Sequence, residues 1–178
     1  EQVLAEGCAD MVSMARPMLA DADFVAKAAA GKADRIAPCI ACNQACLDHT
    51  FGGKISSCLV NPRACYETDL VITPAEVPKT IAVVGAGPAG LSAALTAAER
   101  GHKVTLIDKS NRLGGQLNMA RQVPGKEEFH GLVDWFEVMV ADAGITVKLG
   151  VQATVDTLKD FDEVIIAPGV VPRDPEIP

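Results

Sequence analysis

Short apolar runs alternate with helical patterns in the C-terminal half of the chain. Thr80 to Val84 is a β-branched run of the kind found in buried parallel strands, and Lys103 to Ile107 is a second. Between them, the small residues from Leu91 to Arg100 predict a helix that ends at Gly101. Strands that alternate with helices are typical of a parallel α/β sheet. Two later runs predict further strands: Ile145 to Leu149 and Glu163 to Ala167.

A longer amphipathic pattern lies between these strands. Apolar residues recur at helical spacing from Glu127 to Ala143, and Gly144 follows as a stop signal. The segment therefore predicts a helix with one buried face. That face consists of Phe129, Leu132, Val133, Phe136, Met139, Val140 and Ala143.

The N-terminal part has fewer elements. Asp10 to Ala15 predicts a short buried strand, followed by Arg16 and Pro17. Asp21 or Asp23 can cap a short helix that runs through Ala30, with Gly31 as its stop signal. One strand and one helix cannot bury a core, so we expect this chain to be part of a longer polypeptide. Arg16 after a strand end is a candidate phosphate ligand, and a solvated turn arginine is the alternative.

Cysteines are concentrated between these two parts, in the pattern C-x2-C-x3-C-x11-C formed by Cys39, Cys42, Cys46 and Cys58. Four thiolates at this spacing favour an iron–sulfur cluster, in which each iron of a cubane takes one cysteine. Structural zinc sites more often use paired short spacers, and the three-residue gap fits them poorly. Zinc, and thiols that bind no metal, remain the alternatives.

A glycine-rich turn joins the first predicted strand to its helix. The stretch Gly85-Ala86-Gly87-Pro88-Ala89-Gly90 has the G-x-G-x-x-G spacing of dinucleotide-binding folds. Gly85 permits the tight turn, Gly87 lets backbone amides approach a pyrophosphate, and Gly90 allows close packing of helix on strand. A glycine turn without a ligand is the alternative.

Asp108 ends the next predicted strand, where dinucleotide folds place an acidic residue. Its carboxylate can accept hydrogen bonds from ribose hydroxyls and would repel a 2′-phosphate. This half of the chain therefore favours FAD or NAD over NADP. Gly114 and Gly115 follow, and adjacent glycines indicate either close approach to a ligand or a plain loop.

Composition and charge exclude other classes. The chain is 49% hydrophobic and 22% charged, as globular proteins are, and its net charge of −7 argues against a nucleic-acid surface. No apolar run is long enough to span a membrane, and no signal peptide is visible. We therefore expect a cytoplasmic protein without nucleic-acid or membrane partners.

The cysteine region resembles that of one enzyme family over an extended stretch. Residues 39–54 and 57–65, together with Gln122-Val123-Pro124-Gly125-Lys126-Glu127-Glu128-Phe129, resemble the flavin and iron–sulfur enzymes of the 2,4-dienoyl-CoA reductase and trimethylamine dehydrogenase group. The resemblance is closest to the NADPH-dependent 2,4-dienoyl-CoA reductases. One position differs, because Pro168 stands where that family usually has threonine.

The resemblance implies a domain order. Residues 1–31 would be the C-terminal end of an FMN-binding TIM barrel, 32–67 an iron–sulfur segment, and 68–79 a linker. Residues 80–178 would be the first half of a Rossmann-like FAD-binding domain, into which the family inserts an NADPH domain.

The resemblance also implies roles for single residues. A 4Fe–4S cluster would be held by the four cysteines, with Cys8 and Cys65 left as free thiols. Ala15 and Arg16 would bind the FMN phosphate. The implied FAD contacts, beside the glycines of the turn and Gly115, are Ala89, Asp108, Gln116, Lys126 and Ala153.

The implied activity is NADPH-dependent reduction of 2,4-dienoyl-CoA thioesters in the degradation of unsaturated fatty acids. Electrons would pass from NADPH through FAD and the 4Fe–4S cluster to FMN. No catalytic residue is expected in these 178 residues. Alternatives are an electron-transfer subunit similar to the glutamate synthase small subunit, a zinc-and-nucleotide binding module, and an enoate- or amine-active enzyme of the same group.

Overall fold

The computed structural model describes every residue except 1, 172, 175 and 178. The chain divides into two compact units. One consists of residues 2–71 and 124–138, and the other of residues 72–123 together with the described part of 139–177.

The second unit is built on a parallel sheet of four strands: β1 (Thr80–Val84), β2 (Lys103–Asp108), β3 (Thr146–Leu149) and β4 (Glu163–Ile166). Their spatial order is β3-β2-β1-β4, and every neighbouring pair is parallel. The parallel α/β sheet predicted from the apolar runs is confirmed.

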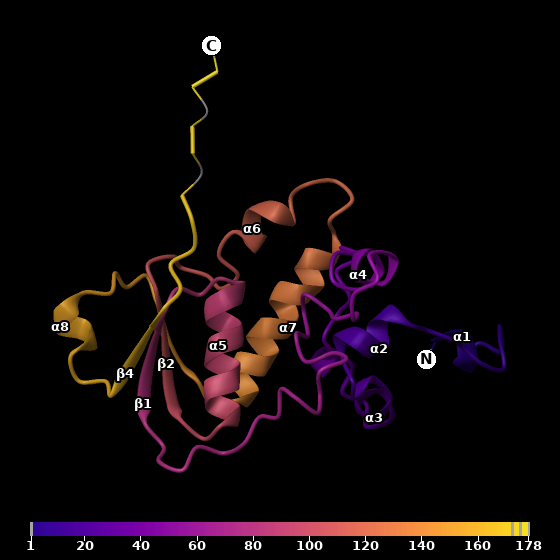
Figure 1. Cartoon of the computed structure of the whole chain (residues 1–178), viewed down its shortest axis with the longest axis horizontal. Helices are drawn as coiled ribbons and strands as arrows, with labels where there is room; N and C mark the ends of the chain where they lie inside the picture. Colours follow the sequence, from indigo (N-terminus) through magenta and orange to yellow (C-terminus); the bar gives the residue numbers. More distant parts are fainter. Residues whose placement is uncertain (1, 172, 175, 178) are drawn as a thin grey trace. The chain divides into compact units, whose positions relative to one another are not determined.

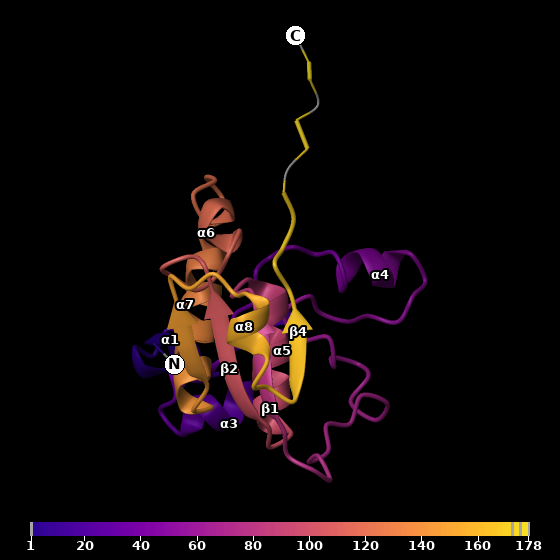
Figure 2. The ribbon, with the colours of Figure 1, turned by 90° about the vertical axis from the view of Figure 1, so that its left-hand side faces the viewer.

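Helices lie on both faces of this sheet. Helix α5 (Pro88–Glu99) lies against one face and α8 (Val155–Leu158) on the opposite face (Figures 1 and 2). Leu91 and Ala94 of α5 are fully buried, as are Val83 and Leu106 of the central strands. The edge strands β3 and β4 are largely exposed. The core of this unit therefore lies between β1, β2 and α5.

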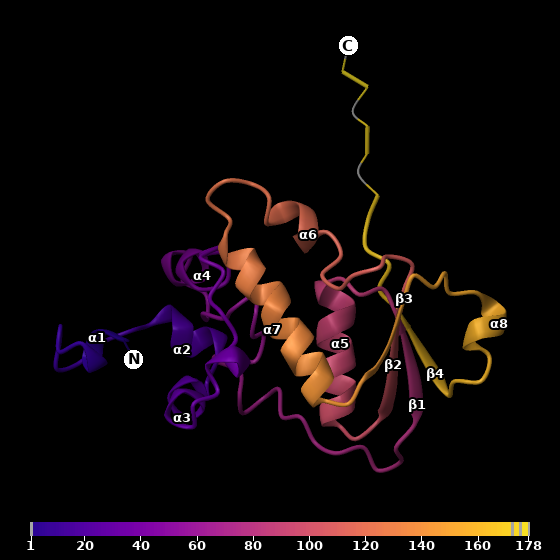
Figure 3. The same cartoon turned by 180° about the vertical axis from the view of Figure 1, so that it is seen from behind.

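The amphipathic segment forms helix α7 (Glu128–Asp142), which is seen along its whole length in Figure 3. Most of its predicted apolar face is confirmed: Leu132, Val133, Phe136 and Val140 are buried, and Phe129 and Met139 are half-buried. Ala143 is exposed and lies just beyond the end of the helix. A short helix, α6 (Leu117–Ala120), precedes it.

The first unit contains only short helices. These are α1 (Gln2–Ala5), α2 (Arg16–Ala20), α3 (Phe24–Ala29), the 3-10 turn η1 (Ala33–Arg35) and α4 (Leu47–Phe51). The predicted helix after Asp23 is confirmed as α3, but the Asp23 side chain makes no capping hydrogen bond. Within the same unit, the indole Nε1 of Trp135 donates to the carbonyl of Arg35 over 3.1 Å.

The predicted buried strand from Asp10 to Ala15 is wrong. These residues are irregular, and Met11 is 82% exposed. A strand needs neighbours for its backbone hydrogen bonds, and the sheet strands described in this chain belong to the other unit.

The region predicted as a linker, residues 68–79, contains no helix or strand. Among the described residues, no helix has the length and apolar character needed to cross a membrane.

Candidate functional site

The four predicted cysteine ligands meet in the first unit. The thiol-bearing residues Cys39, Cys42, Cys46 and Cys58 all line one small cavity, and each is half-buried. Cys8 and Cys65 are exposed and do not line it. The structure thus separates the same four cysteines from the other two as the sequence spacing does.

Two backbone links bring the ends of the cysteine segment together. Helix α4 begins directly after Cys46, and the chain returns so that the amide of Ser57 donates to the carbonyl of Ala45 over 2.7 Å. This bond places Cys58 beside Cys46. The side-chain amide of Asn61 then donates to the carbonyl of Leu19 over 3.0 Å and holds the return in place.

The entry to the cysteine segment is fixed by a buried carboxylate. Asp21 is 5% exposed, and its carboxylate accepts from the amide of Ala37 over 2.8 Å and pairs with Lys27 over 2.6 Å. The sequence indicated Asp21 only as a possible helix cap. Its anchoring role depends on a contact between residues far apart in the chain, and no local pattern marks it.

The backbone around Cys42 has an unusual conformation. Ala41 and Asn43 have positive φ angles of 51° and 61°. Residues other than glycine rarely adopt this region, at a cost of about 1–3 kcal/mol each, and such residues cluster at ligand-binding sites. These two residues flank Cys42, which lines the cysteine cavity.

Arg16 also lines the cysteine cavity. Its Nη1 donates to the side-chain oxygen of Asn43 over 2.5 Å. Ala15 is exposed at the N-cap position of α2. Binding of an FMN phosphate by these two residues stays a prediction. Sequence reasoning missed Asn43, although its place directly after Cys42 was a usable signal.

Four thiols are the donor set that an iron–sulfur cubane takes. In the described part of the chain, no three His, Cys, Asp or Glu side chains are grouped closely enough to hold one metal ion. A zinc ion would need its thiolates at about 2.3 Å from one point. A cubane takes one thiolate per iron, so its four ligands need not meet at one point.

The dinucleotide motif of the second unit lies at the carboxyl ends of the strands. Strand β1 is flanked by β2 on one side and by β4 on the other, so the strand order reverses there. Open α/β sheets bind ligands in the crevice at such a switch point. The turn after β1 and the end of β4 lie at these carboxyl ends. We call this end of the sheet the dinucleotide edge.

Glycines permit the close backbone contacts of this edge. Gly85 has a φ of +112°, and a Cβ there would lie 1.9 Å from the carbonyl oxygen of Ala167. A Cβ on Gly90 would lie 1.8 Å from the carbonyl oxygen of Gly85. A larger residue at either position would collide with backbone. This agrees with the tight turn predicted at Gly85 and the close packing predicted at Gly90.

Two loops form a cradle of bare backbone. A Cβ on Gly115 would lie 2.8 Å from the Cα of Gly87, and the amide of Gly114 donates to the carbonyl of Ala86 over 2.8 Å. Gly87 is the N-cap of α5, and no side chain caps the first turn of that helix. Uncapped amides at a helix N-terminus bind anions such as a pyrophosphate.

Asp108 is tied to the same cradle. One carboxylate oxygen accepts from the amide of Ala86 over 2.6 Å, and the other from the amide of Ser110 over 2.6 Å. Each oxygen has a second lone pair, so both can still accept from a ribose. The structure therefore adds a role in ordering the glycine turn to the predicted one.

The four other predicted FAD contacts lie in different parts of the chain. Ala89 is exposed in the first turn of α5, and the side-chain amide of Gln116 donates to the carbonyl of Val170 over 2.7 Å. Ala153 lies two residues after Val151, whose amide donates to the carbonyl of Asp108 over 2.9 Å. Lys126 belongs to the first unit, where its ammonium lies 5.7 Å from the ring centre of Phe129.

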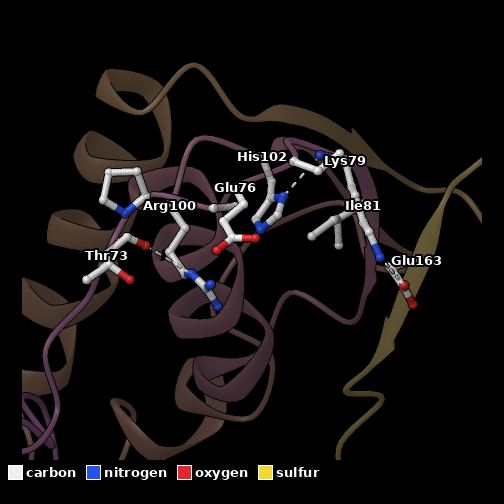
Figure 4. Close-up of a pocket in the computed structure, with 10 residues that line it drawn as sticks. Thr73, Glu76, Lys79, Ile81, Arg100, His102 and Glu163 are labelled. Carbon is white, nitrogen blue, oxygen red and sulfur yellow. Dashed lines mark hydrogen bonds and ion pairs between the residues drawn. The ribbon is translucent and has the colours of Figure 1, made fainter.

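A second cavity, of about 570 Å³, lies at the amino ends of the strands, opposite the dinucleotide edge (Figure 4). Lys79 and Glu163, at the amino ends of β1 and β4, form an ion pair of 2.7 Å there, and this hydrogen bond raises the pKa of Lys79. The Nε of Arg100 donates to the carbonyl of Thr73 over 3.2 Å. None of the predicted site residues lines this cavity.

Residues 79–178 match the family model for the pyridine nucleotide-disulphide oxidoreductases. The chain belongs to this family. The match begins one residue before β1 and includes the glycine cradle, Asp108 and the end of β4. The family assignment thus covers the whole dinucleotide edge.

Curated relatives of this pyridine nucleotide-disulphide oxidoreductase extend the likeness across the cysteine segment. A metal reductase of Desulforamulus reducens is 42% identical over 100% of this chain and 28% of its own length. A cinnamate reductase of Clostridium sporogenes is 39% identical over 96% of this chain and 26% of its own length. The chain therefore spans little more than a quarter of these relatives.

Solved structures have the same fold. A 2-naphthoyl-CoA reductase in complex with 2-naphthoyl-CoA superposes with a TM-score of 0.95 at 37% identity, over 99% of this chain and 27% of that one. Histamine dehydrogenase from Rhizobium sp. 4-9 superposes with a TM-score of 0.88 at 28% identity, over 99% of this chain and 27% of that one.

Proposed function

We propose that this chain is the electron-transfer part of a flavin and iron–sulfur oxidoreductase. One observation carries the proposal: four thiols spread over the segment from Cys39 to Cys58 line a single cavity. Cys39, Cys42, Cys46 and Cys58 would each bind one iron of a 4Fe–4S cluster. Such a cluster supplies the transfer of single electrons.

The dinucleotide edge of the second unit would hold FAD, which supplies exchange between electron pairs and single electrons. The uncapped start of α5 would bind the pyrophosphate, and Gly87 at its N-cap carries no side chain; Gly85, Gly90 and Gly115 permit the close backbone contacts that shape this edge. Asp108 accepts from the ribose while it holds the glycine turn through Ala86. These residues would bind and orient the FAD. None of them is proposed to donate or accept a proton in the reaction.

For the whole protein we propose NADPH as electron donor, FMN as a second flavin, and a conjugated acyl-CoA thioester, such as a 2,4-dienoyl-CoA, as the small-molecule substrate. Support comes from the reductase solved with 2-naphthoyl-CoA and from the cinnamate reductase, whose names describe reduction of conjugated carboxylic acid derivatives. The amine dehydrogenase among the solved neighbours marks the competing substrate class.

The decisive experiment is metal and sulfide analysis of the protein that carries this chain, purified without oxygen. We expect about four iron and four sulfide per chain. Cys58→Ser should lose the cluster and its visible absorbance. Cys65→Ser is the matched control, since Cys65 is exposed outside the cavity, and it should keep both.

Zinc in place of iron, or cluster loss in Cys65→Ser alone, would contradict the metal assignment. The substrate class is tested on the same preparation. NADPH should be consumed together with a 2,4-dienoyl-CoA, and turnover of amines without turnover of thioesters would reject that part of the proposal.

A further inference from the structure

Arg16 is the charged residue of the cysteine cavity. Apart from the four cysteines, the described residues that line the cavity are Arg16, Leu19, Ile40, Asn43, Ala45 and Leu59. Leu19, Ile40, Ala45 and Leu59 are apolar and Asn43 is neutral. The guanidinium is therefore the one formal charge in this wall, as far as the described residues define it.

The guanidinium is held in place by the cysteine loop itself. Nη1 of Arg16 donates to Oδ1 of Asn43 over 2.5 Å, across 27 positions of the sequence. Asn43 is also fixed through its backbone, because its carbonyl accepts from the amide of Asp48 at the start of α4 over 3.0 Å. Arg16 is thus bonded to the residue that follows the ligand Cys42.

That residue is also one of the two with a positive φ beside Cys42. The φ of Asn43 is 61°, a conformation that asparagine tolerates better than most side chains but that still needs support from its surroundings. The bond from Arg16 supplies such support from a different segment of the unit. Loss of the bond would free the loop at Cys42.

We propose that Arg16 is a positioning residue of the cluster site, which holds the Cys42 turn through Asn43 and raises the reduction potential of the cluster with its charge. The proposal rests on the proposed function, because it requires a cluster at the four cysteines. It differs from the role implied by the family resemblance, in which Arg16 binds the FMN phosphate.

The sign of the effect on the potential follows from electrostatics. Four thiolates around the iron leave the site with net negative charge, and reduction adds one more negative charge. A cation in the wall stabilises the reduced form more than the oxidised form. Arg16 is exposed and so is its bond to Asn43, so water screens part of this effect. Removal of the cation must shift the midpoint potential to more negative values.

The test uses the protein as purified and a redox titration followed by electron paramagnetic resonance. Arg16→Gln should shift the cluster midpoint negative and lower the iron content. Arg16→Lys, which keeps the charge, should show less than half of that shift. Lys54→Gln is the matched control: it removes the same charge between Cys46 and Cys58, at an exposed position that does not line the cavity.

Asn43→Gly separates positioning from charge. Glycine adopts a positive φ without strain but cannot accept from Arg16. This variant should lose iron faster to a chelator than the unmodified protein does, while the shift in midpoint stays smaller than in Arg16→Gln.

Three results would overturn the inference. One is an unchanged midpoint and iron content in Arg16→Gln, and another is an equal shift in Lys54→Gln. The third is loss of FMN alone in Arg16→Gln, which would return Arg16 to the phosphate. An unmodified protein without iron would instead reject the proposed function, so the two failures are distinguishable.

Discussion

Backbone amides largely determine how Asp108 is held at the end of β2. Its two carboxylate oxygens accept from Ala86 and from Ser110 at 2.6 Å each. The carboxylate therefore joins the glycine turn after β1 to the loop after β2. A ribose bound there would meet an oxygen whose direction is already set, which reduces the entropy lost on binding.

Removal of this carboxylate should weaken FAD binding. For Asp108→Ala we expect a loss of about 1.5–3 kcal/mol, the usual range for hydrogen bonds to a charged group, with a further loss from disorder of the turn at Ala86. The measurement is FAD fluorescence during equilibrium dialysis of the protein. Full FAD occupancy in Asp108→Ala would remove this residue from the site.

Asp108→Asn serves as the graded control. An amide has one acceptor atom instead of two, so it can keep either the bond to Ala86 or the bond to Ser110. Its FAD affinity should lie between those of the unmodified protein and Asp108→Ala.

At the scale of elements, the start of β1 is joined to β4 by side chains as well as by the sheet. The carboxylate of Asp162 accepts from the amide and from the hydroxyl of Thr80, both over 2.7 Å. These bonds favour the charged carboxylate and lower the pKa of Asp162. The residues next in sequence, Lys79 and Glu163, form an ion pair of 2.7 Å, which Figure 4 shows.

Stability of the sheet should accordingly fall in acid. Because the folded-state pKa of Asp162 is lower than its unfolded-state value, its contribution is complete above about pH 4 and is lost as the pH falls through the folded-state pKa. Asp162→Asn should make the acid side of the stability profile shallower. Urea unfolding at a series of pH values measures this.

Asp160→Asn is the matched control, since it removes the same charge from a nearby exposed position. Its profile should run parallel to that of the unmodified protein. If both variants change the profile equally, the bonds to Thr80 are not responsible. The raised pKa of Lys79 acts at the other end of the range, where its contribution is lost as the pH rises.

The elements differ in how well the sequence predicted them. Strands β1 and β2 and helix α7 were predicted because their own apolar spacing marks their buried faces, and β3 and β4 because their apolar runs have the same strand-like composition. The run from Asp10 to Ala15 has similar spacing but is exposed, because a strand depends on neighbours that its own sequence does not encode. The short helices α2, α4 and α6 have too few residues to show a period.

In the candidate site, too, local features were predicted and contacts between distant segments were not. Cysteine spacing and the glycine motif are local, so the sequence indicated the four cysteines of the cavity and the glycines of the backbone cradle. The contacts that hold them were not predicted, because Asp21 with Ala37, Asn61 with Leu19 and Arg16 with Asn43 each join separate segments.

At the scale of the whole molecule, each unit carries apolar side chains on its surface. Met11, Phe51 and Ile55 of the first unit are 82%, 85% and 61% exposed, and Ile166 on the edge strand β4 is 63% exposed. Large exposed apolar residues and unpaired strand edges promote association.

The 178-residue chain produced alone should therefore self-associate. In size-exclusion chromatography with light scattering we expect species larger than a monomer, and the double change Phe51→Ser with Ile166→Thr should shift the population toward monomer. A monodisperse monomer of the unmodified chain would show that these side chains are tolerated in water.

The order of synthesis gives the cysteine cavity a further property. Every residue that lines the cavity falls between Arg16 and Leu59, and Asn61 adds the bond that holds the return. The dinucleotide edge, in contrast, joins Gly85 to Ala167 and Gln116 to Val170. A ribosome therefore releases all parts of the cavity wall long before it completes the nucleotide cradle, so the thiols of the proposed cluster site leave the ribosome while the sheet is still being made.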